Sequence, residues 1–328
     1  MFTRRSLLQF PVLAALAASA TLSAAGVDST LLALIPPDAT VLSGVSVQQA
    51  KASVFGQYML GQMQLDDVEF QKFIADTGFD PRRDLNFIVS ATSGDSAANK
   101  TLILGRGIFN PGKIANVTQA GGAKLINYKG VDVVTHSGSD LIGALAFLDA
   151  TTVVMGPLDG VKVAIDRRGQ TTPALSAALV ARVNALATAN DAWFLSTVSP
   201  ATFFNGKLDN AKVGPMIEAG LIQSVISGSG GLKFSANGAT ISGQAVARSD
   251  KDASALADVF RFLVNIVGSS RGTSPEAEKF ATVLETMQIS TQGSSMNLSL
   301  SIPESTLEGL FMGKQHHSVD RASATGRQ

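Results

Sequence analysis

The chain has 328 residues, with 26 basic and 26 acidic side chains, three histidines and no cysteine. The lack of cysteine excludes disulfides, thiol nucleophiles, iron–sulfur clusters, cysteine zinc sites and a cysteine-linked lipid anchor. The balanced charge argues against a nucleic-acid partner, because binding to the phosphate backbone needs a basic face.

The N-terminus has the three parts of a secretory signal peptide. Arg4 and Arg5 precede an apolar run over residues 7–22, and small residues surround two possible cleavage points. Cleavage after Ala20 and cleavage after Ala25 both fit the small-residue rule. A retained membrane anchor is the alternative interpretation, but a spanning helix needs about 20 apolar residues and this run is shorter.

The export route stays open between two pathways. The segment Thr3-Arg4-Arg5-Ser6-Leu7-Leu8-Gln9 resembles the twin-arginine signal, although Leu7 stands where that signal usually has Phe. An ordinary Sec signal that carries two arginines is the alternative. With a signal peptide over residues 1–25 removed by either route, we expect a periplasmic or extracellular protein without a transmembrane segment.

Apolar periodicity, capping residues and turn residues predict a folded body that begins at residue 34. Up to residue 170 they predict, in chain order, a strand at 40–47, helices at 48–63 and 65–76, a hairpin of 85–91 and 101–107, a helix at 110–120, strands at 124–128, 131–136, 142–148 and 152–155, and a helix at 161–167. Beyond it they predict a helix at 173–187, a strand at 193–198, a helix at 213–219, strands at 222–227, 232–236 and 240–247, helices at 253–267 and 275–286, and a hairpin of 288–291 and 296–302.

The element order and one short segment suggest an internal duplication. Residues 38–46 and 191–199 are identical at six of nine positions. We therefore expect an α+β fold of two tandem, duplicated units of antiparallel sheet, each with helices packed on one face. The first unit would cover 34–170 and the second 171–312. The tail, 313–328, has no apolar period and is expected to be disordered.

Catalytic, metal and cofactor motifs are weak throughout the chain. His136 is the only histidine inside the body, and Ser270 belongs to a G-x-S-x-G string that links two predicted helices instead of a strand and a helix. Zinc normally needs three or four ligands held in place. The Gly228–Gly231 run lacks the lysine of a phosphate loop and is interpreted as a flexible hairpin turn. No catalytic residue, metal site or cofactor is predicted.

Two segments supply candidate interaction residues. Asp80 opens a capped turn in which Arg82 and Arg83 can pair with neighbouring carboxylates or with an anion of a partner. Phe260 and Leu263 belong to a strongly apolar predicted helix, which is either a core helix or the wall of a groove. If the chain is duplicated, a seam lies between its units, and ligand sites favour such interfaces. We therefore expect these residues near a seam.

The Leu-Ile-Pro-Pro-Asp-Ala segment at 34–39 and the Thr-Gly-Phe-Asp-Pro-Arg-Arg-Asp-Leu segment at 77–85 carry a resemblance. Together with the signal peptide and the general layout, they resemble a group of exported bacterial proteins of acidobacterial and planctomycete type. That group has no assigned activity. The resemblance therefore implies location and style of fold, and it implies no site residues.

Two hypotheses about function follow. The first is a non-enzymatic periplasmic or envelope protein that binds a partner protein or an apolar ligand, or serves as a scaffold. The alternative is a hydrolase with an atypical site built from Ser, Asp, Glu and Arg. Converging acidic or Ser/His groups in a concave site would favour the hydrolase, whereas an apolar groove or a flat surface would favour binding.

Overall fold

The computed structural model describes residues 26–53, 56–57, 60, 68–93, 101–135, 143–199, 219–235, 238–269, 275–304 and 306. The expected signal peptide, His136, Ser270 and the expected disordered tail lie outside the described residues. The helices are α1 (Ser29–Leu34), α2 (Val47–Ala52), α4 (Val68–Thr77), α5 (Pro81–Asp84), α6 (Pro111–Ala120), α7 (Leu158–Asp166), α8 (Ala177–Ala189), α10 (Ala219–Ser224), α11 (Asp250–Ser269) and α12 (Pro275–Glu285). The strands are β1 (Ala39–Ser46), β2 (Leu85–Ser93), β3 (Thr101–Gly107), β4 (Lys124–Tyr128), β5 (Val131–Thr135), β6 (Ala144–Phe147), β7 (Thr152–Gly156), β8 (Ala192–Ser196), β9 (Val225–Ser235), β10 (Gly238–Ala247), β11 (Gln288–Gln292) and β12 (Ser295–Pro303).

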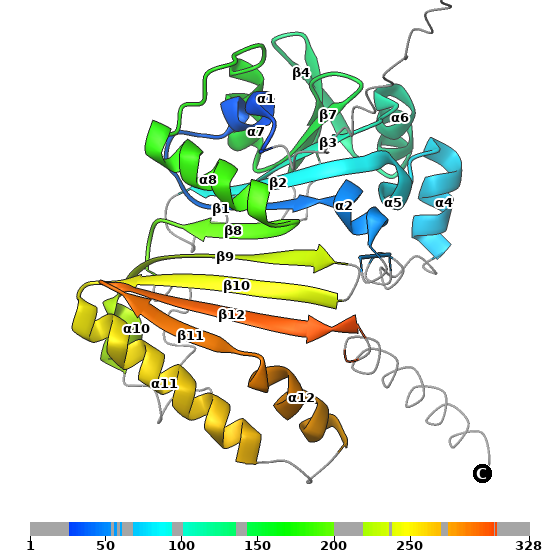
Figure 1. The fold of residues 1–328 in the computed structure, drawn as a ribbon. Coiled ribbons are helices and arrows are strands. Elements are labelled where there is room, and N and C mark those ends of the chain that lie inside the picture. The colour runs from blue at the N-terminus through cyan, green and yellow to red at the C-terminus, as the bar shows by residue number, and fades with distance from the viewer. Residues whose placement is uncertain are drawn as a thin grey trace, which may run out of the picture.

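Within the described residues, the strands form one antiparallel sheet of twelve strands, in the order β11-β12-β10-β9-β8-β1-β2-β3-β7-β6-β5-β4 (Figure 1). This arrangement, with helices packed on the sheet, confirms the predicted α+β class and antiparallel sheet. The pairing of β1 with β8 makes the sheet continuous from the first half of the chain into the second. We call the β1–β8 pair the seam.

One face of the sheet, which we call the first face, is covered by α1, α7 and α8. The largest buried cluster contains Leu31 of α1, Val161 of α7 and Val183 of α8, together with Leu42 and Leu195 of the two seam strands. Burying aliphatic side chains of this size stabilises the fold by about 1.5–3 kcal/mol for each of them. The first face of the seam is therefore part of the main core.

The opposite face, which we call the second face, has a separate cluster in each half of the molecule. Before the seam, Phe73 of α4 and Ile114 of α6 pack with Val153 of β7. After the seam, Leu256 of α11 packs with Met296 of β12. Helices thus lie on both faces of the continuous sheet. Within residues 34–170, α7 covers the first face and α4 and α6 cover the second, so the expectation of helices on one face of each unit is not met there. Between these two clusters, the second face at the seam carries apolar side chains that are half-exposed.

The strand orders on the two sides of the seam correspond. Moving outward, one side reads β1-β2-β3-β7-β6 and the other reads β8-β9-β10-β12-β11. In addition, α6 follows β3 and α11 follows β10, and both helices pack on the second face. The hairpin of β4 and β5 extends the first side alone. The expected duplication stays a prediction.

Several local features follow from the sequence as expected. The side chain of Asn110 accepts a hydrogen bond from the backbone N–H of Lys113 at 3.1 Å, which caps α6 directly before Pro111. Gly122 follows the end of this helix with φ of +92°, a left-handed value that costs glycine little. The helix predicted at 110–120 is therefore confirmed.

Other local expectations differ from the structure. Gly228 and Gly231 do not form a hairpin turn, because both lie inside β9 and pair with Ala245 and Ser242 of β10. The strand predicted at 222–227 instead begins at Val225, after the short helix α10. The packed chain also starts before residue 34, since α1 inserts four buried side chains into the core.

Candidate functional site

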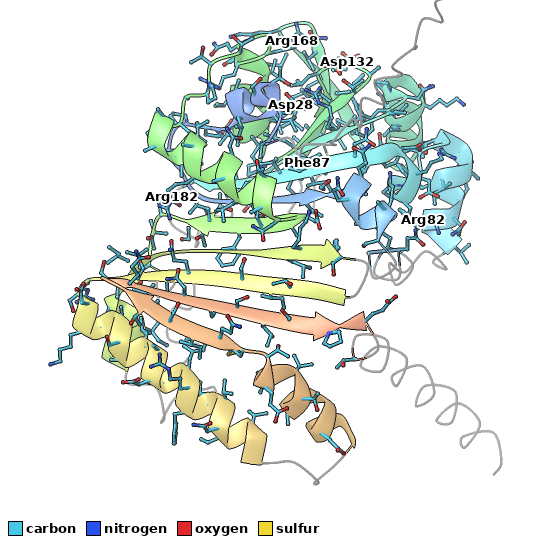
Figure 2. All side chains as sticks on the ribbon, in the orientation of Figure 1. Asp28, Arg82, Phe87, Asp132, Arg168 and Arg182 are labelled. Carbon is cyan, nitrogen blue, oxygen red and sulfur yellow. The ribbon has the colours of Figure 1, made fainter. Side chains whose placement is uncertain are left out.

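The predicted interaction residues Asp80, Arg82 and Arg83 lie together in and before α5. The Asp80 carboxylate accepts hydrogen bonds from the backbone N–H and from Nε of Arg82, both at 3.0 Å. Nε of Arg83 donates to Asp84 at 2.7 Å. Hydrogen bonds from Arg82 hold the pKa of the Asp80 carboxyl below its ordinary value. The two arginines pair with the two aspartates of the same turn, so the turn itself accounts for this group of charges. Figure 2 labels Arg82.

Phe260 and Leu263 lie on α11, in the other half of the molecule. Phe260 is half-buried and packs against the cluster of the second half, and Leu263 is also half-buried. The helix contacts β10, β11 and β12, whereas α5 leads directly into β2. Because three strands separate β2 from β10, about 19 Å lie between the two regions. The structure does not bring the two predicted groups into one site.

A second charged cluster surrounds Arg106 of β3. Its Nε donates to Asp28 at 2.9 Å, and its other nitrogens contact Thr30, Thr151 and Thr152. Burial raises the pKa of the Asp28 carboxyl, but hydrogen bonds from Thr30 and Arg106 outweigh it and leave that pKa below its ordinary value. An ionised carboxylate held in this way cannot donate a proton near neutral pH. The cluster ties the first described residues to β3; Figure 2 labels Asp28.

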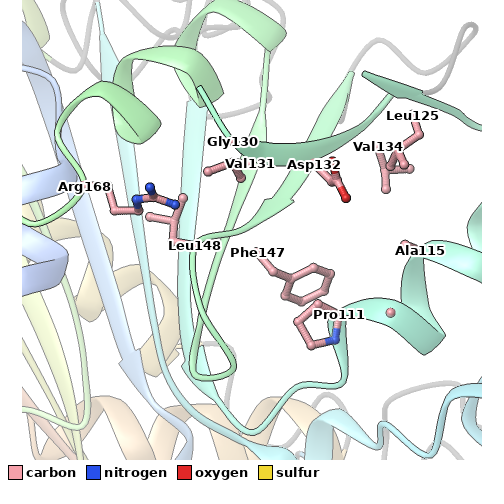
Figure 3. A pocket seen from close by; sticks show the side chains of 11 residues that line it. Pro111, Ala115, Leu125, Gly130, Val131, Asp132, Val134, Phe147, Leu148 and Arg168 are labelled. Atoms are coloured by element: carbon pink, nitrogen blue, oxygen red, sulfur yellow. The ribbon is translucent and has the colours of Figure 1, made fainter. Parts of the chain in front are cut away.

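A hollow of about 230 Å³ lies between α6 and the outer strands β4 and β5. Figure 3 shows Pro111 and Phe147 on its wall, with Asp132 and Arg168 set apart from each other. The Asp132 carboxylate accepts a hydrogen bond from Nδ2 of Asn127 at 2.9 Å. The wall holds one carboxylate, and Asp132 does not converge there with a second acid, a serine or a histidine. The arrangement offers no general acid–base pair.

The seam carries a different kind of surface, an apolar hollow of about 320 Å³ on the second face of the sheet, which we call the seam hollow. Val45 of β1, Phe194 of β8, Leu232 of β9 and Ile241 of β10 supply its larger aliphatic and aromatic side chains. Its remaining lining residues are Gly44, Ala192, Trp193, Gly230, Gly231 and Ser242. None of these residues is charged, so the hollow can recognise an apolar group and cannot pair with an ion.

Glycine makes this hollow possible at the position opposite Phe194. Phe194 and Gly230 are register partners in neighbouring strands. A Cβ at Gly230 would lie 2.6 Å from Cε1 of Phe194, so the ring lies across the glycine backbone. The ring nonetheless stays 49% exposed. An aromatic ring that lies over a glycine, with half of its surface in water, is accessible to an apolar ligand.

The seam hollow was missed because it depends on strand pairing. Gly230 belongs to the glycine run that the sequence pattern assigns to a turn, and a turn would leave Phe194 without this neighbour. The alternation within β8 could have found Phe194, since Trp193 and Leu195 are buried and Phe194 is not. The seam itself was expected as the location of a site, whereas the residues that form the hollow were not predicted.

The described part of the chain also lacks a candidate metal cluster and a candidate membrane-spanning helix. No group of three or more His, Cys, Asp or Glu side chains among the described residues could hold a metal ion. No helix among them is both long enough and apolar enough to cross a membrane.

Comparison with known proteins finds only distant structural neighbours. No family model and no curated protein matches the chain. Three solved structures of TP0453 are similar to it. Crystal form III has 10% identity, a TM-score of 0.48 and coverage of 85% of this chain and 96% of its own. Form I has 9% identity, a TM-score of 0.44 and coverage of 85% and 95%. Form IV has 11% identity, a TM-score of 0.46 and coverage of 82% and 92%.

Proposed function

We propose that this protein is exported to the periplasm or cell envelope and binds an apolar ligand in the seam hollow. The observation that carries the binding role is Phe194, which is held over Gly230 with half of its surface exposed. Val45 and Ile241 extend the apolar area on either side of it. Sites for small apolar ligands are lined mainly by hydrophobic and aromatic side chains, as this hollow is.

The chemistry of the lining supports an apolar ligand over a charged one. Ser242 is the hydroxyl-bearing residue of the seam hollow, and its Oγ lies 3.4 Å from Oδ1 of Asn190, on the first face. A ligand in the hollow therefore meets aliphatic and aromatic carbon. Removing apolar surface from water contributes about 25 cal/mol of binding free energy for each Å² buried. An alkyl chain or an uncharged ring is therefore the class of ligand that would bind most favourably.

The export part of the proposal rests on the sequence. Arg4 and Arg5, the apolar run over 7–22 and the small residues up to Ala25 form the signal peptide pattern. Fractionation of expressing cells tests this part. The mature protein should appear in the envelope fraction without its first residues, and an intact Met1 on cytoplasmic protein would contradict export.

Equilibrium titration with 1-N-phenylnaphthylamine, an uncharged fluorescent probe, tests the binding part. The wild-type protein should bind it, and Phe194→Ser should weaken binding about five- to tenfold, since the probe loses contact with the ring. Phe262→Ser is the matched control, because Phe262 is a 54% exposed phenylalanine on α11, outside the hollow. Equal weakening by both substitutions, or no binding by the wild type, would overturn the proposal.

A further inference from the structure

The first residues of the described chain are part of the folded core. Val27 is 7% exposed and belongs to the main buried cluster, together with Leu31 and Leu32 of α1. Asp28 caps α1 by accepting a hydrogen bond from the backbone N–H of Thr30 at 2.8 Å. Its other carboxylate oxygen pairs with Arg106. The fold therefore holds the chain firmly at Val27 and Asp28.

Gly26, one residue earlier, lies against the side chain of Asn184 on α8. A Cβ at Gly26 would come within 2.8 Å of Oδ1 of Asn184 and 3.4 Å of its Cβ. A residue with a side chain would have to push Asn184 away, so glycine fits here for steric reasons. The contact brings the backbone at residue 26 to the half-buried side-chain amide of Asn184, on a helix that is distant in sequence.

The carbonyl oxygen of that amide lacks a partner. Oδ1 of Asn184 is buried and accepts no hydrogen bond from the described residues. A buried acceptor left unsatisfied costs about 1–3 kcal/mol, so native proteins normally supply a donor. The nearby backbone of Gly26 is the place from which a donor can come.

We propose that the signal peptide is cut between Ala25 and Gly26, and that the new α-ammonium group of Gly26 donates to Oδ1 of Asn184. This inference rests on the export part of the proposed function. In the cut, a water molecule adds to the carbonyl carbon of Ala25 and the bond to the Gly26 nitrogen breaks. The signal peptide keeps a carboxylate, and the Gly26 nitrogen takes up a proton to become an ammonium group.

The free ammonium group suits the buried acceptor better than a peptide nitrogen does. It has three N–H donors that can rotate, whereas a peptide nitrogen has one in a fixed direction. It is also charged, and hydrogen bonds from charged donors are about twice as strong as neutral ones. Cleavage after Ala20 would leave five more residues ahead of Gly26, and a peptide nitrogen in place of the ammonium group. The geometry therefore favours the second of the two cleavage points.

Intact-mass analysis and N-terminal sequencing of protein exported with its own signal peptide give the first test. A start at Gly26 is expected. A start at Thr21 would overturn the inference while leaving export standing, whereas an intact Met1 would overturn export itself.

The role of Asn184 is tested on the full mature chain. Chains that begin at Gly26 or at Ala24 can be released from a cleavable fusion and compared by thermal unfolding. The two-residue extension should lower the midpoint by about 2–5 °C in the wild type. It should have no such effect in Asn184→Leu, which lacks the acceptor.

Asn184→Asp keeps the acceptor and adds a negative charge, so it covers the case in which Asn184→Leu fails to fold. With Asp at this position, the chain that begins at Gly26 should unfold at a higher midpoint than the extended chain, and the difference in midpoint should be larger than in the wild type. Midpoints that do not depend on the start residue, or that shift equally in all three backgrounds, would overturn the assigned contact.

Discussion

Leu42 of β1 and Leu195 of β8 are register partners across the seam, and they are 1% and 0% exposed. They are also equivalent positions in the similar segments 38–46 and 191–199. In an antiparallel pair, equivalent residues can lie opposite each other only where a local two-fold axis passes between them. The duplication proposed from the sequence would therefore place its axis at this leucine pair, in the main core.

The register of the seam predicts a specific disulfide. Val45 and Ala192 are partners on the second face, and the cysteine-free chain gives a clean background. The double variant Val45→Cys with Ala192→Cys should form an intramolecular disulfide on mild oxidation, because partner Cα atoms lie within the range that a disulfide spans. Non-reducing electrophoresis after proteolysis measures it. Val45→Cys with Ile241→Cys, about 14 Å apart, should remain reduced, and linkage there would disprove the register.

Adding a side chain at Gly44 should destabilise the fold. A Cβ at Gly44 would lie 2.6 Å from Cε2 of Trp193, whose ring lies over it in the core. Gly44→Ala should therefore destabilise the protein by about 1–3 kcal/mol. Urea unfolding followed by the fluorescence of Trp193, the single tryptophan, measures this. Gly228→Ala is the control, since its Cβ would meet Gln244 at an ordinary 3.5 Å. Equal losses in both variants would argue against the contact.

The ion pair of Asp28 with Arg106 predicts a pH-dependent contribution. The pKa of Asp28 is lower in the folded protein than its ordinary value, so the pair stabilises the fold above the unfolded pKa, about 4, and loses this contribution as the pH falls through the folded value. Because the Asp28 side chain is 38% exposed, screening limits the contribution to about 1 kcal/mol or less. Asp28→Asn should thus be less stable than the wild type at pH 7, with a difference that shrinks below pH 4. A constant difference would contradict this.

The export route is tested by Arg4→Lys combined with Arg5→Lys. The double variant keeps the positive charge and removes the arginine pair. If the twin-arginine pathway is used, the mature protein should disappear from the envelope fraction and precursor should accumulate, as measured by immunoblotting of cell fractions. Unchanged export would assign the protein to the Sec pathway.

The sequence was most informative where local chemistry decides the structure. Asn110 and Pro111 start α6 because a capping side chain and a fixed φ act within one turn. The α1 helix was not predicted, since six residues soon after the expected signal peptide carry too little periodicity. The sequence pattern predicted two strands in place of β9, because glycine is depleted in strands. In the structure, pairing with β8 and β10 keeps the glycine run extended, and Phe194 packs over Gly230. The seam hollow needs four strands from distant segments, so its composition could not be read from any one of them.

The most direct test of the binding role uses methyl NMR of protein labelled at isoleucine and titrated with dodecanol. Ile241 lines the seam hollow, and Ile126 on β4 is almost equally exposed, at 36% against 37%, but lies outside it. The account predicts a saturable shift of the Ile241 methyl resonance that Phe194→Ser abolishes, with Ile126 unchanged. An Ile241 methyl resonance that does not shift, or an equal shift of the Ile126 resonance, would contradict an apolar site at the seam.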